Sequence, residues 1–204
     1  MTFSYYANTA RNTIQKYGQD DPQNLEKESS LLVPIDHALA LLKQGKIAIF
    51  NVTEIHQFWL LDDPDLGIKI RLREERKLPS LASSDIAFSW PKKPQEPTEI
   101  TYTHTVKHKV DSLSSWEVNS PLTKQNFKAI LTLYHHKKHL PIRVEKLRYH
   151  IVAQGINPSF FYVTADLYPD SDTLRFEFEY RAYFAHSEPL EIPDYFYSSE
   201  VKND

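Results

Sequence analysis

Residues 173–184 constrain the fold more than any other segment, because their sequence, TLRFEFEYRAYF, alternates without a break. Charged residues occupy one parity of the segment, and aromatic residues dominate the other. Side chains of a β-strand point alternately to opposite faces, so a strand here has one charged face and one apolar face. An antiparallel sheet often exposes its polar face to water, and this segment alone therefore predicts a half-buried strand and no site.

Pairs of like charges that share one face recur along the chain. The predicted strands carry them at Glu26 and Glu28, at Lys69, Arg71 and Arg73, at Lys107 and Lys109, at Lys146 and Arg148, and at Glu177 and Glu179. Burial of so many charges is costly unless they are paired, hydrated or bound to a ligand. A closed antiparallel barrel with these faces inward would hold cations for phosphate oxygens and carboxylates for a divalent metal.

Composition limits the kinds of partner that this chain can have. Its 204 residues are 41% apolar, enough for one globular domain with a sizeable core. A net charge of -3 provides no global basic field for nucleic acid or membrane, so any polyanion site must be local. Cysteine is absent, which excludes disulfides and thiol chemistry. With no membrane span or signal-peptide pattern, we expect a soluble cytoplasmic protein without a membrane partner.

The order of the predicted elements indicates an α+β fold of many antiparallel strands with a few flanking helices, and the charged faces favour closure of the strands into a β-barrel. Residues 1–24 are expected to form an N-terminal arm or helix, and residues 25–204 a single domain. A segment rich in proline and serine at about 77–99 is expected to be an insertion. Ser120 and Pro121 have the pattern of a helix start, and that helix should end before Pro141.

Six segments of the chain resemble, in order, those of the CYTH domains, also called triphosphate tunnel metalloenzymes. They are LEKESSLLVP with Glu26 and Glu28, HQFWLLDDPDLGIKIRLREE with Arg71 and Arg73, THTVKHK with Lys107, VEKLRYHI with Lys146, Arg148 and Tyr149, VTADLYPDSDTLRFEFEY with Asp166, Tyr168, Glu177 and Glu179, and EIPDYFYSSEVKND. The resemblance covers roughly residues 25–204. Ser30 departs from it, because the family has a lysine at that position.

The resemblance implies a barrel that encloses a triphosphate tunnel, with three sets of functional residues. The expected ligands of Mg²⁺ or Mn²⁺ are Glu26, Glu28, Asp166, Glu177 and Glu179. The expected phosphate ligands are Arg71, Arg73, Lys107, Lys109, Lys146 and Arg148. The expected catalytic residues are Glu26, Glu28 and Lys146. The alternative for these residues is a set of solvated strand faces with surface ion pairs, and Asp166 could equally be an outer carboxylate or a turn residue.

The expected reaction is metal-dependent hydrolysis of a small-molecule triphosphate, with inorganic tripolyphosphate as the leading substrate. Thiamine triphosphate, cyclisation of ATP and an RNA 5′-triphosphate end remain open within the family, and we expect no other nucleic-acid partner. A non-catalytic module that binds a triphosphate or nucleotide is the rival from another class, and Ser30 favours it. A third alternative is an α+β interaction protein with solvated charged faces. The HHKKH run at 135–139 is interpreted as a solvated helix end and not as a metal site.

Overall fold

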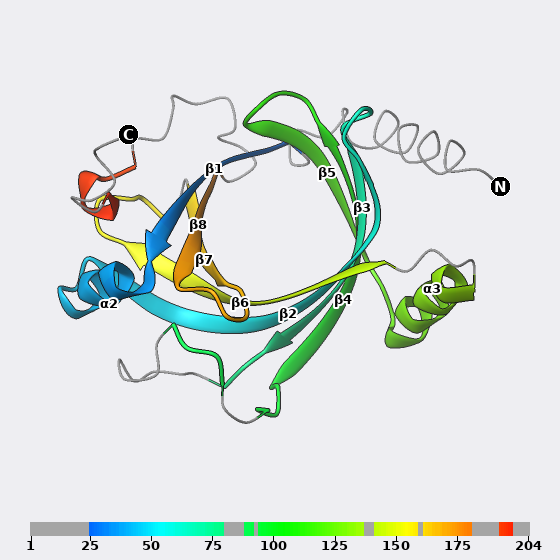
Figure 1. The fold of residues 1–204 in the computed structure, drawn as a ribbon, viewed down its shortest axis with the longest axis horizontal. Helices are drawn as coiled ribbons and strands as arrows, with labels where there is room; N and C mark the ends of the chain where they lie inside the picture. The colour runs from blue at the N-terminus through cyan, green and yellow to red at the C-terminus, as the bar shows by residue number, and fades with distance from the viewer. Residues whose placement is uncertain are drawn as a thin grey trace. The chain divides into compact units, whose positions relative to one another are not determined.

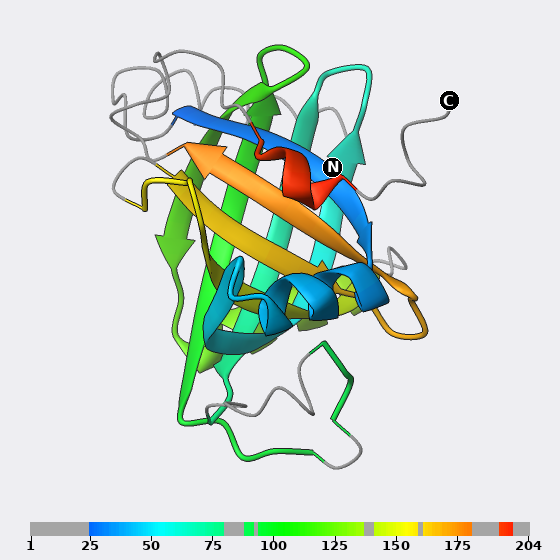
Figure 2. The same cartoon turned by 90° about the vertical axis from the view of Figure 1, so that its left-hand side faces the viewer.

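The computed structural model describes residues 25–79, 88–91, 94–136, 141–158, 161–180 and 192–197. The elements within them are β1 (Leu25–Pro34), α2 (Ile35–Lys43), β2 (Ile47–Asp63), β3 (Ile68–Lys77), β4 (Glu99–Lys109), β5 (Ser114–Pro121), α3 (Lys124–His136), β6 (Ile142–Ala153), β7 (Phe161–Leu167), β8 (Thr173–Tyr180) and the 3₁₀ helix η3 (Asp194–Phe196). The strands close into a barrel in the order β1-β5-β4-β3-β2-β6-β7-β8 (Figures 1 and 2). The predicted α+β fold, a closed antiparallel barrel with flanking helices, is confirmed.

Strand β1 has two hydrogen-bonding partners along its length. Residues 25–27 pair with β5, and residues 28–34 pair with β8, both antiparallel. In the second register Glu28 lies opposite Glu179, and Ser30 lies opposite Glu177. Directly paired residues of an antiparallel ladder project to the same face, so these four side chains share one face of the sheet.

The connection after β5 differs from the sequence prediction. Ser120 and Pro121 are the last residues of β5, and Pro121 lies opposite Thr103 of β4. Helix α3 begins at Lys124, where the Asn126 backbone N–H donates to the Thr123 hydroxyl at 3.1 Å. The prediction that Pro121 starts the helix was wrong, because pairing with β4 extends the strand through the proline.

Two other expected segments lie partly or wholly outside the described residues. The N-terminal arm at 1–24 is wholly outside them. Of the insertion, residues 80–87 and 92–93 are outside them, while its ends are defined by β3 and β4. There the Thr98 N–H donates to the Lys77 carbonyl at 2.8 Å, so the chain leaves and re-enters the sheet at adjacent points.

The chain divides into two compact units, each with its own apolar core. The first unit is Met1–Lys27, Ile55–Arg76 and Ile100–Glu145, and the second is Glu28–Glu54, Lys77–Glu99 and Lys146–Asp204. In the first unit, buried residues of β3 pack with Phe127 of α3, whose ring lies 4.9 Å from that of Tyr102. Helix α3 is therefore attached through an aromatic contact with β4.

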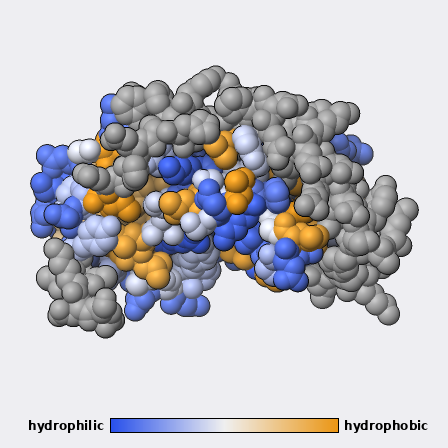
Figure 3. Space-filling model, turned by 90° about the horizontal axis from the view of Figure 1, so that it is seen from above, coloured by the Kyte–Doolittle hydropathy of each residue, from blue (hydrophilic) through white to orange (hydrophobic). Residues whose placement is uncertain are grey.

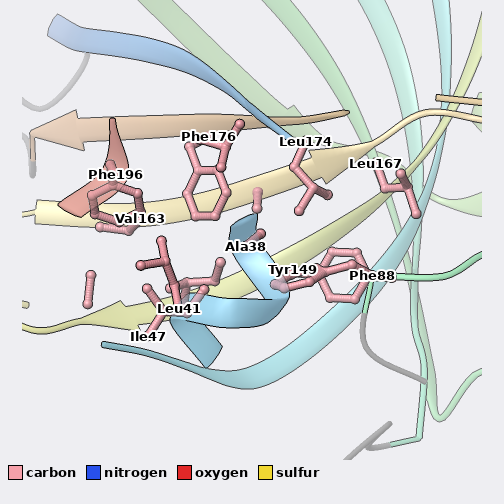
Figure 4. Close-up of a cluster of buried hydrophobic side chains, with 14 of the residues drawn as sticks. Ala38, Leu41, Ile47, Phe88, Tyr149, Val163, Leu167, Leu174, Phe176 and Phe196 are labelled. Carbon is pink, nitrogen blue, oxygen red and sulfur yellow. The ribbon is translucent and has the colours of Figure 1, made fainter. Parts of the chain in front are cut away.

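In the second unit α2 and η3 contribute to the apolar cluster of β6, β7 and β8 (Figure 4). Ala38 and Leu41 of α2 belong to this cluster. The ring of Phe196 in η3 lies 5.1 Å from Phe176 and 5.2 Å from Phe178, both fully buried. Contact between aromatic rings in these edge-on arrangements adds to the energy of burial alone.

The alternation of charged and apolar residues along β8 matches the burial of their side chains. Leu174, Phe176, Phe178 and Tyr180 are buried, and the residues between them are half-buried. Since α2 and η3 cover the apolar face, the charged positions of β8 lie on the other face, which is the inner one in a closed barrel. The charged face is therefore not simply the wet side of an open sheet.

None of the described helices is long and apolar enough to cross a membrane. On the face drawn in Figure 3, apolar residues are scattered among hydrophilic ones. Leu32 and Phe50 are among the exposed large apolar side chains. Scattered exposed residues of this kind are normal on protein surfaces and require no partner to explain them.

Candidate functional site

Strand alternation in the first unit separates its charged side chains from its core. On β3, Ile70 and Leu72 belong to the apolar cluster, so Arg71 lies on the opposite face. On β4, Val106 belongs to the same cluster, so Lys107 also lies on the opposite face. The same rule that fills the core thus collects the basic residues on one surface of this unit.

We call the residues Glu26, Arg71, Lys107 and Glu117 the first network. Lys107 forms an ion pair with Glu26, and the Ser115 hydroxyl donates to the same carboxylate at 3.3 Å. Arg71 Nη2 donates to Glu117 Oε1 at 3.1 Å, and Lys107 Nζ lies 3.7 Å from Glu117 Oε2. Two cations and two carboxylates from four strands are therefore interleaved on this surface.

Glu117 is the most buried carboxylate of the first network, with a side chain only 10% exposed. Burial alone would raise its pKa, but the charges of Arg71 and Lys107 outweigh burial and lower the pKa to about 2. The Asn119 amide also donates to Glu117 Oε1, at 2.9 Å. Glu117 is therefore an anion throughout the physiological pH range.

We call the residues Lys146, Arg148, Asp166 and Glu177 the second network. Asp166 is fully buried and accepts from Lys146 and from Arg148, whose Nε and Nη2 are 2.7 and 2.8 Å from the two carboxylate oxygens. Arg148 also donates to Glu177. The strand register explains this cluster, since Arg148 of β6 lies opposite Asp166 of β7.

Burial and charge oppose each other in the second network. Burial, together with the neighbouring charge of Arg148, lowers the pKa of Lys146 to about 8, although Asp166 and Glu177 favour its charged form. Burial would raise the pKa of Asp166, but Arg148 and Lys146 lower it to about 2. With a pKa of about 8, Lys146 is a cation at neutral pH and loses its proton in mildly alkaline solution.

Arg175 joins the second network to the acidic residues of β1 and β8. Its Nε lies 3.5 Å from Glu177 Oε1, and its Nη2 lies 3.9 Å from Glu28 Oε1. Glu28 itself is directly opposite Glu179 in the β1–β8 ladder. Two carboxylates in directly opposed positions repel each other, and a cation beside them reduces that repulsion.

The structure brings together most of the site residues expected from the sequence, within one unit or the other. Glu26, Arg71 and Lys107 belong to the first network, and Lys146, Arg148, Asp166 and Glu177 to the second. Arg73 forms an ion pair with Glu75 of its own strand, at 2.9 Å, and its charge also helps to lower the pKa of Glu117. Lys109 is exposed at the end of β4, opposite Ser115. Of the HHKKH run, residues 137–139 lie outside the described residues.

Two residues of these surfaces were not selected by the sequence analysis. Glu117 was missed because β5 was not predicted as a strand, although its position opposite Lys107 would have indicated a charge pair. Arg175 lies on the charged face of β8, but its sign differs from that of the glutamates beside it, and no sequence pattern predicted its position next to Glu28.

The expected metal ligands are carboxylates, which supply the oxygen donors that a hard divalent cation requires. In the part of the chain that the structure describes, no group of three or more His, Asp or Glu residues is placed to hold a metal ion. Both Asp166 oxygens accept hydrogen bonds from cations, which fits a positioning role for this residue. Glu28 and Glu179 do supply two carboxylates on one face, and Mg²⁺ commonly binds through one or two carboxylates together with substrate phosphates. These two residues fit a metal that is held jointly with substrate.

Comparisons with known proteins return solved structures only at low similarity. No family model matches the chain, and no curated protein matches its sequence. The PH1819 protein from Pyrococcus horikoshii OT3 is 12% identical with a TM-score of 0.49, over 82% of this chain and 80% of that one. The inorganic triphosphatase NE1496 is 19% identical with a TM-score of 0.36, over 87% of each chain. At these values the activity of a neighbour says nothing about this chain, and the fold rests on its own strand order.

Proposed function

We propose that this protein is a metal-dependent hydrolase of a small-molecule triphosphate, with inorganic tripolyphosphate as its substrate. The phosphate ligands would be Arg71, Arg73, Lys107, Lys109, Lys146 and Arg148. The metal ligands would be Glu26, Glu28, Glu177 and Glu179, with Asp166 positioning Lys146 and Arg148, and with Glu26, Glu28 and Lys146 as the catalytic residues. We place the reaction in the cytoplasm, with no membrane partner and no nucleic-acid partner other than an RNA 5′ end.

The observation that carries this proposal is the composition of the charged faces. Arg71 and Lys107 are largely buried in the first unit, as are Lys146 and Arg148 in the second, and each has carboxylate partners. Partly buried cations of this kind cost free energy and bring little stability by themselves. Arginine forks and lysine ammonium groups are also the side chains that bind phosphate oxygens most strongly.

The chain's own residues would act mainly by position and charge. Arg148, held by Asp166, would present its guanidinium group to a phosphate oxygen, and Lys146 would supply a second positive charge from the same strand. Charge that spreads over the phosphoryl oxygens in the transition state would then meet cations already in place. When bound, Mg²⁺ or Mn²⁺ would neutralise phosphate charge and lower the pKa of a bound water.

Phosphate release from tripolyphosphate, ATP and thiamine triphosphate, with Mg²⁺ or Mn²⁺, tests this proposal. The wild type should release phosphate from tripolyphosphate, and the double variant Glu177→Gln/Glu179→Gln should lose that release while keeping its circular dichroism spectrum. Glu145→Gln is the matched control, because Glu145 forms its ion pair with Arg143, outside the two networks. Absence of phosphate release from all three substrates would refute the proposed hydrolase activity.

A non-catalytic triphosphate-binding module is the second candidate, and Ser30 favours it. Ser30 is exposed and lies opposite Glu177, where the sequence resemblance has a lysine. A serine hydroxyl adds no charge beside the phosphates, so binding could remain while catalysis is lost. Tripolyphosphate would then raise the melting temperature without being hydrolysed. If the chain is an interaction protein with solvated faces, tripolyphosphate would neither raise the melting temperature nor be hydrolysed.

A further inference from the structure

Glu117 occupies the place on the first network where a bound anion would be expected. Its carboxylate accepts from Arg71 Nη2 at 3.1 Å and lies 3.7 Å from Lys107 Nζ. Arg71 and Lys107 are also two of the residues that we proposed as phosphate ligands. A carboxylate and a phosphate oxygen compete for the donors that face Glu117, so a phosphate that takes Arg71 Nη2 and Lys107 Nζ displaces the carboxylate from them.

A chain of hydrogen bonds fixes Glu117 in that place. The Thr105 hydroxyl donates to Asn119 Oδ1 at 2.6 Å, and Asn119 Nδ2 donates to Glu117 Oε1 at 2.9 Å. Thr105 is fully buried, and all three residues belong to the β4–β5 ladder. The position of Glu117 is therefore built into the fold and is not a chance contact of a mobile surface side chain.

The pairing of Glu117 with its cations is nevertheless incomplete. Among the described residues, Glu117 Oε2 and Arg71 Nε are both buried without a hydrogen-bond partner. A guanidinium can donate through Nε and Nη2 together to one anion, whereas Glu117 receives a single hydrogen bond from Arg71. A phosphate group could accept both hydrogen bonds and would satisfy Arg71 more fully than Glu117 does.

We infer that Glu117 is a resident anion that holds Arg71 and Lys107 in place and is displaced from them by a phosphate of the substrate. The inference rests on the proposed function. It assigns to Glu117 the role of setting the affinity of the site for phosphate anions. A small anion does not bind, because it cannot offset the loss of the Glu117 ion pairs. A condensed phosphate makes further contacts, so it can displace Glu117 and bind. Removal of the Glu117 charge should therefore strengthen anion binding, although it removes a residue from the site.

Calorimetric titration of the full chain with tripolyphosphate and with inorganic phosphate, in metal-free buffer, tests this inference. Glu117→Gln should bind tripolyphosphate about tenfold more tightly than the wild type, and it should bind inorganic phosphate measurably. Its melting temperature without ligand should be lower, since Arg71 and Lys107 lose their anion, and tripolyphosphate should raise it by more than in the wild type. Glu145→Gln removes the same formal charge outside the first network and should leave both affinities unchanged.

The outcomes separate this inference from the proposed function. If the wild type binds tripolyphosphate and Glu117→Gln binds it equally or more weakly, Glu117 is a positioning residue for Arg71 and the inference is overturned while the function stands. If neither protein binds tripolyphosphate in metal-free buffer or in a repeat titration with Mg²⁺, both the inference and the proposed function fail. Should Glu117→Gln not fold, Glu117→Asp withdraws the carboxylate from Arg71 while keeping its charge, and a smaller gain in affinity is then expected. Unchanged or weaker binding by the aspartate variant would overturn the inference.

Discussion

Arg148 and Asp166 form a two-pronged ion pair between β6 and β7, in which Nε donates to Oδ1 at 2.7 Å and Nη2 donates to Oδ2 at 2.8 Å. Asp166 is fully buried and also pairs with Lys146. The carboxylate thus offsets two cations that would otherwise be poorly solvated. This arrangement makes Asp166 the residue on which the stability of the second network most depends.

Asp166→Asn should lower the free energy of unfolding by about 3 kcal/mol, because two buried cations lose the carboxylate that both of them contact. Urea denaturation measures this change. Asp62→Asn is the control, since Asp62 pairs with Lys69 at 3.3 Å where both side chains are close to half exposed, and a loss of no more than about 0.5 kcal/mol is expected there. Equal losses in the two variants would show that burial of the Asp166 pair has no energetic consequence.

The affinity for tripolyphosphate should fall as the pH rises through about 8. Lys146 is protonated below its pKa of about 8 and loses its charge above it, so anion binding must then take up a proton. Titration in steps between pH 7 and 9 measures this dependence. Tripolyphosphate also titrates in this range, and the comparison is therefore made with Lys146→Met, in which the component due to the protein should vanish. An identical pH profile in the two proteins would refute the assignment of Lys146 as a phosphate ligand.

Phe196→Ala should destabilise the fold by about 3 kcal/mol without weakening anion binding. Phe196 packs on Phe176 and Phe178, which lie on the face of β8 opposite to Glu177. Thermal unfolding with and without tripolyphosphate measures both effects. Tyr197→Ala, at an exposed neighbouring position, should change stability by no more than about 0.5 kcal/mol. If the folded Phe196 variant no longer binds tripolyphosphate, the two faces of β8 are not independent.

Arg175→Met should weaken tripolyphosphate binding about fivefold while leaving the melting temperature nearly unchanged. Arg175 lies beside Glu28 and Glu177, and its side chain is 40% exposed, so its removal costs little in the free protein. Arg143→Met is the matched control, because Arg143 is more exposed and pairs with Glu145. Calorimetric titration compares the three proteins. Equal affinities would place Arg175 outside the phosphate site.

Residue alternation was enough to predict the charged face of β8 and the basic positions of β3, β4 and β6. These predictions succeeded because period-two patterning depends only on local geometry, and the opposite parity had enough aromatic and aliphatic residues to form a core. The sign of each charge along the strand was likewise available from the sequence. The barrel was predicted from the recurrence of charged strands together with the resemblance to the CYTH domains, and not from alternation alone.

The features that the sequence did not predict depend on strand register, which local sequence does not specify. Pro121 has the pattern of a helix start, but Leu122 N–H donates to the Tyr102 carbonyl at 2.8 Å, and pairing with β4 prevails. The partnership of Glu117 with Arg71 joins β5 to β3, two strands that are not neighbours in the sheet. Asp166 could not be assigned beforehand, because its role follows from Arg148, which the β6–β7 register places opposite it.

The pairing of β1 with β8 means that the barrel cannot close until the last of the described strands has been synthesised. β1 is the earliest strand to be synthesised among those described, yet residues 28–34 pair with β8, the last one. An unpaired strand edge must therefore persist while the other strands are made, and such edges are where nascent chains associate wrongly. The charge of Glu28 on this edge opposes self-association during that interval. A glutamate assigned to substrate chemistry in the finished barrel would thus first serve as protection for the growing chain.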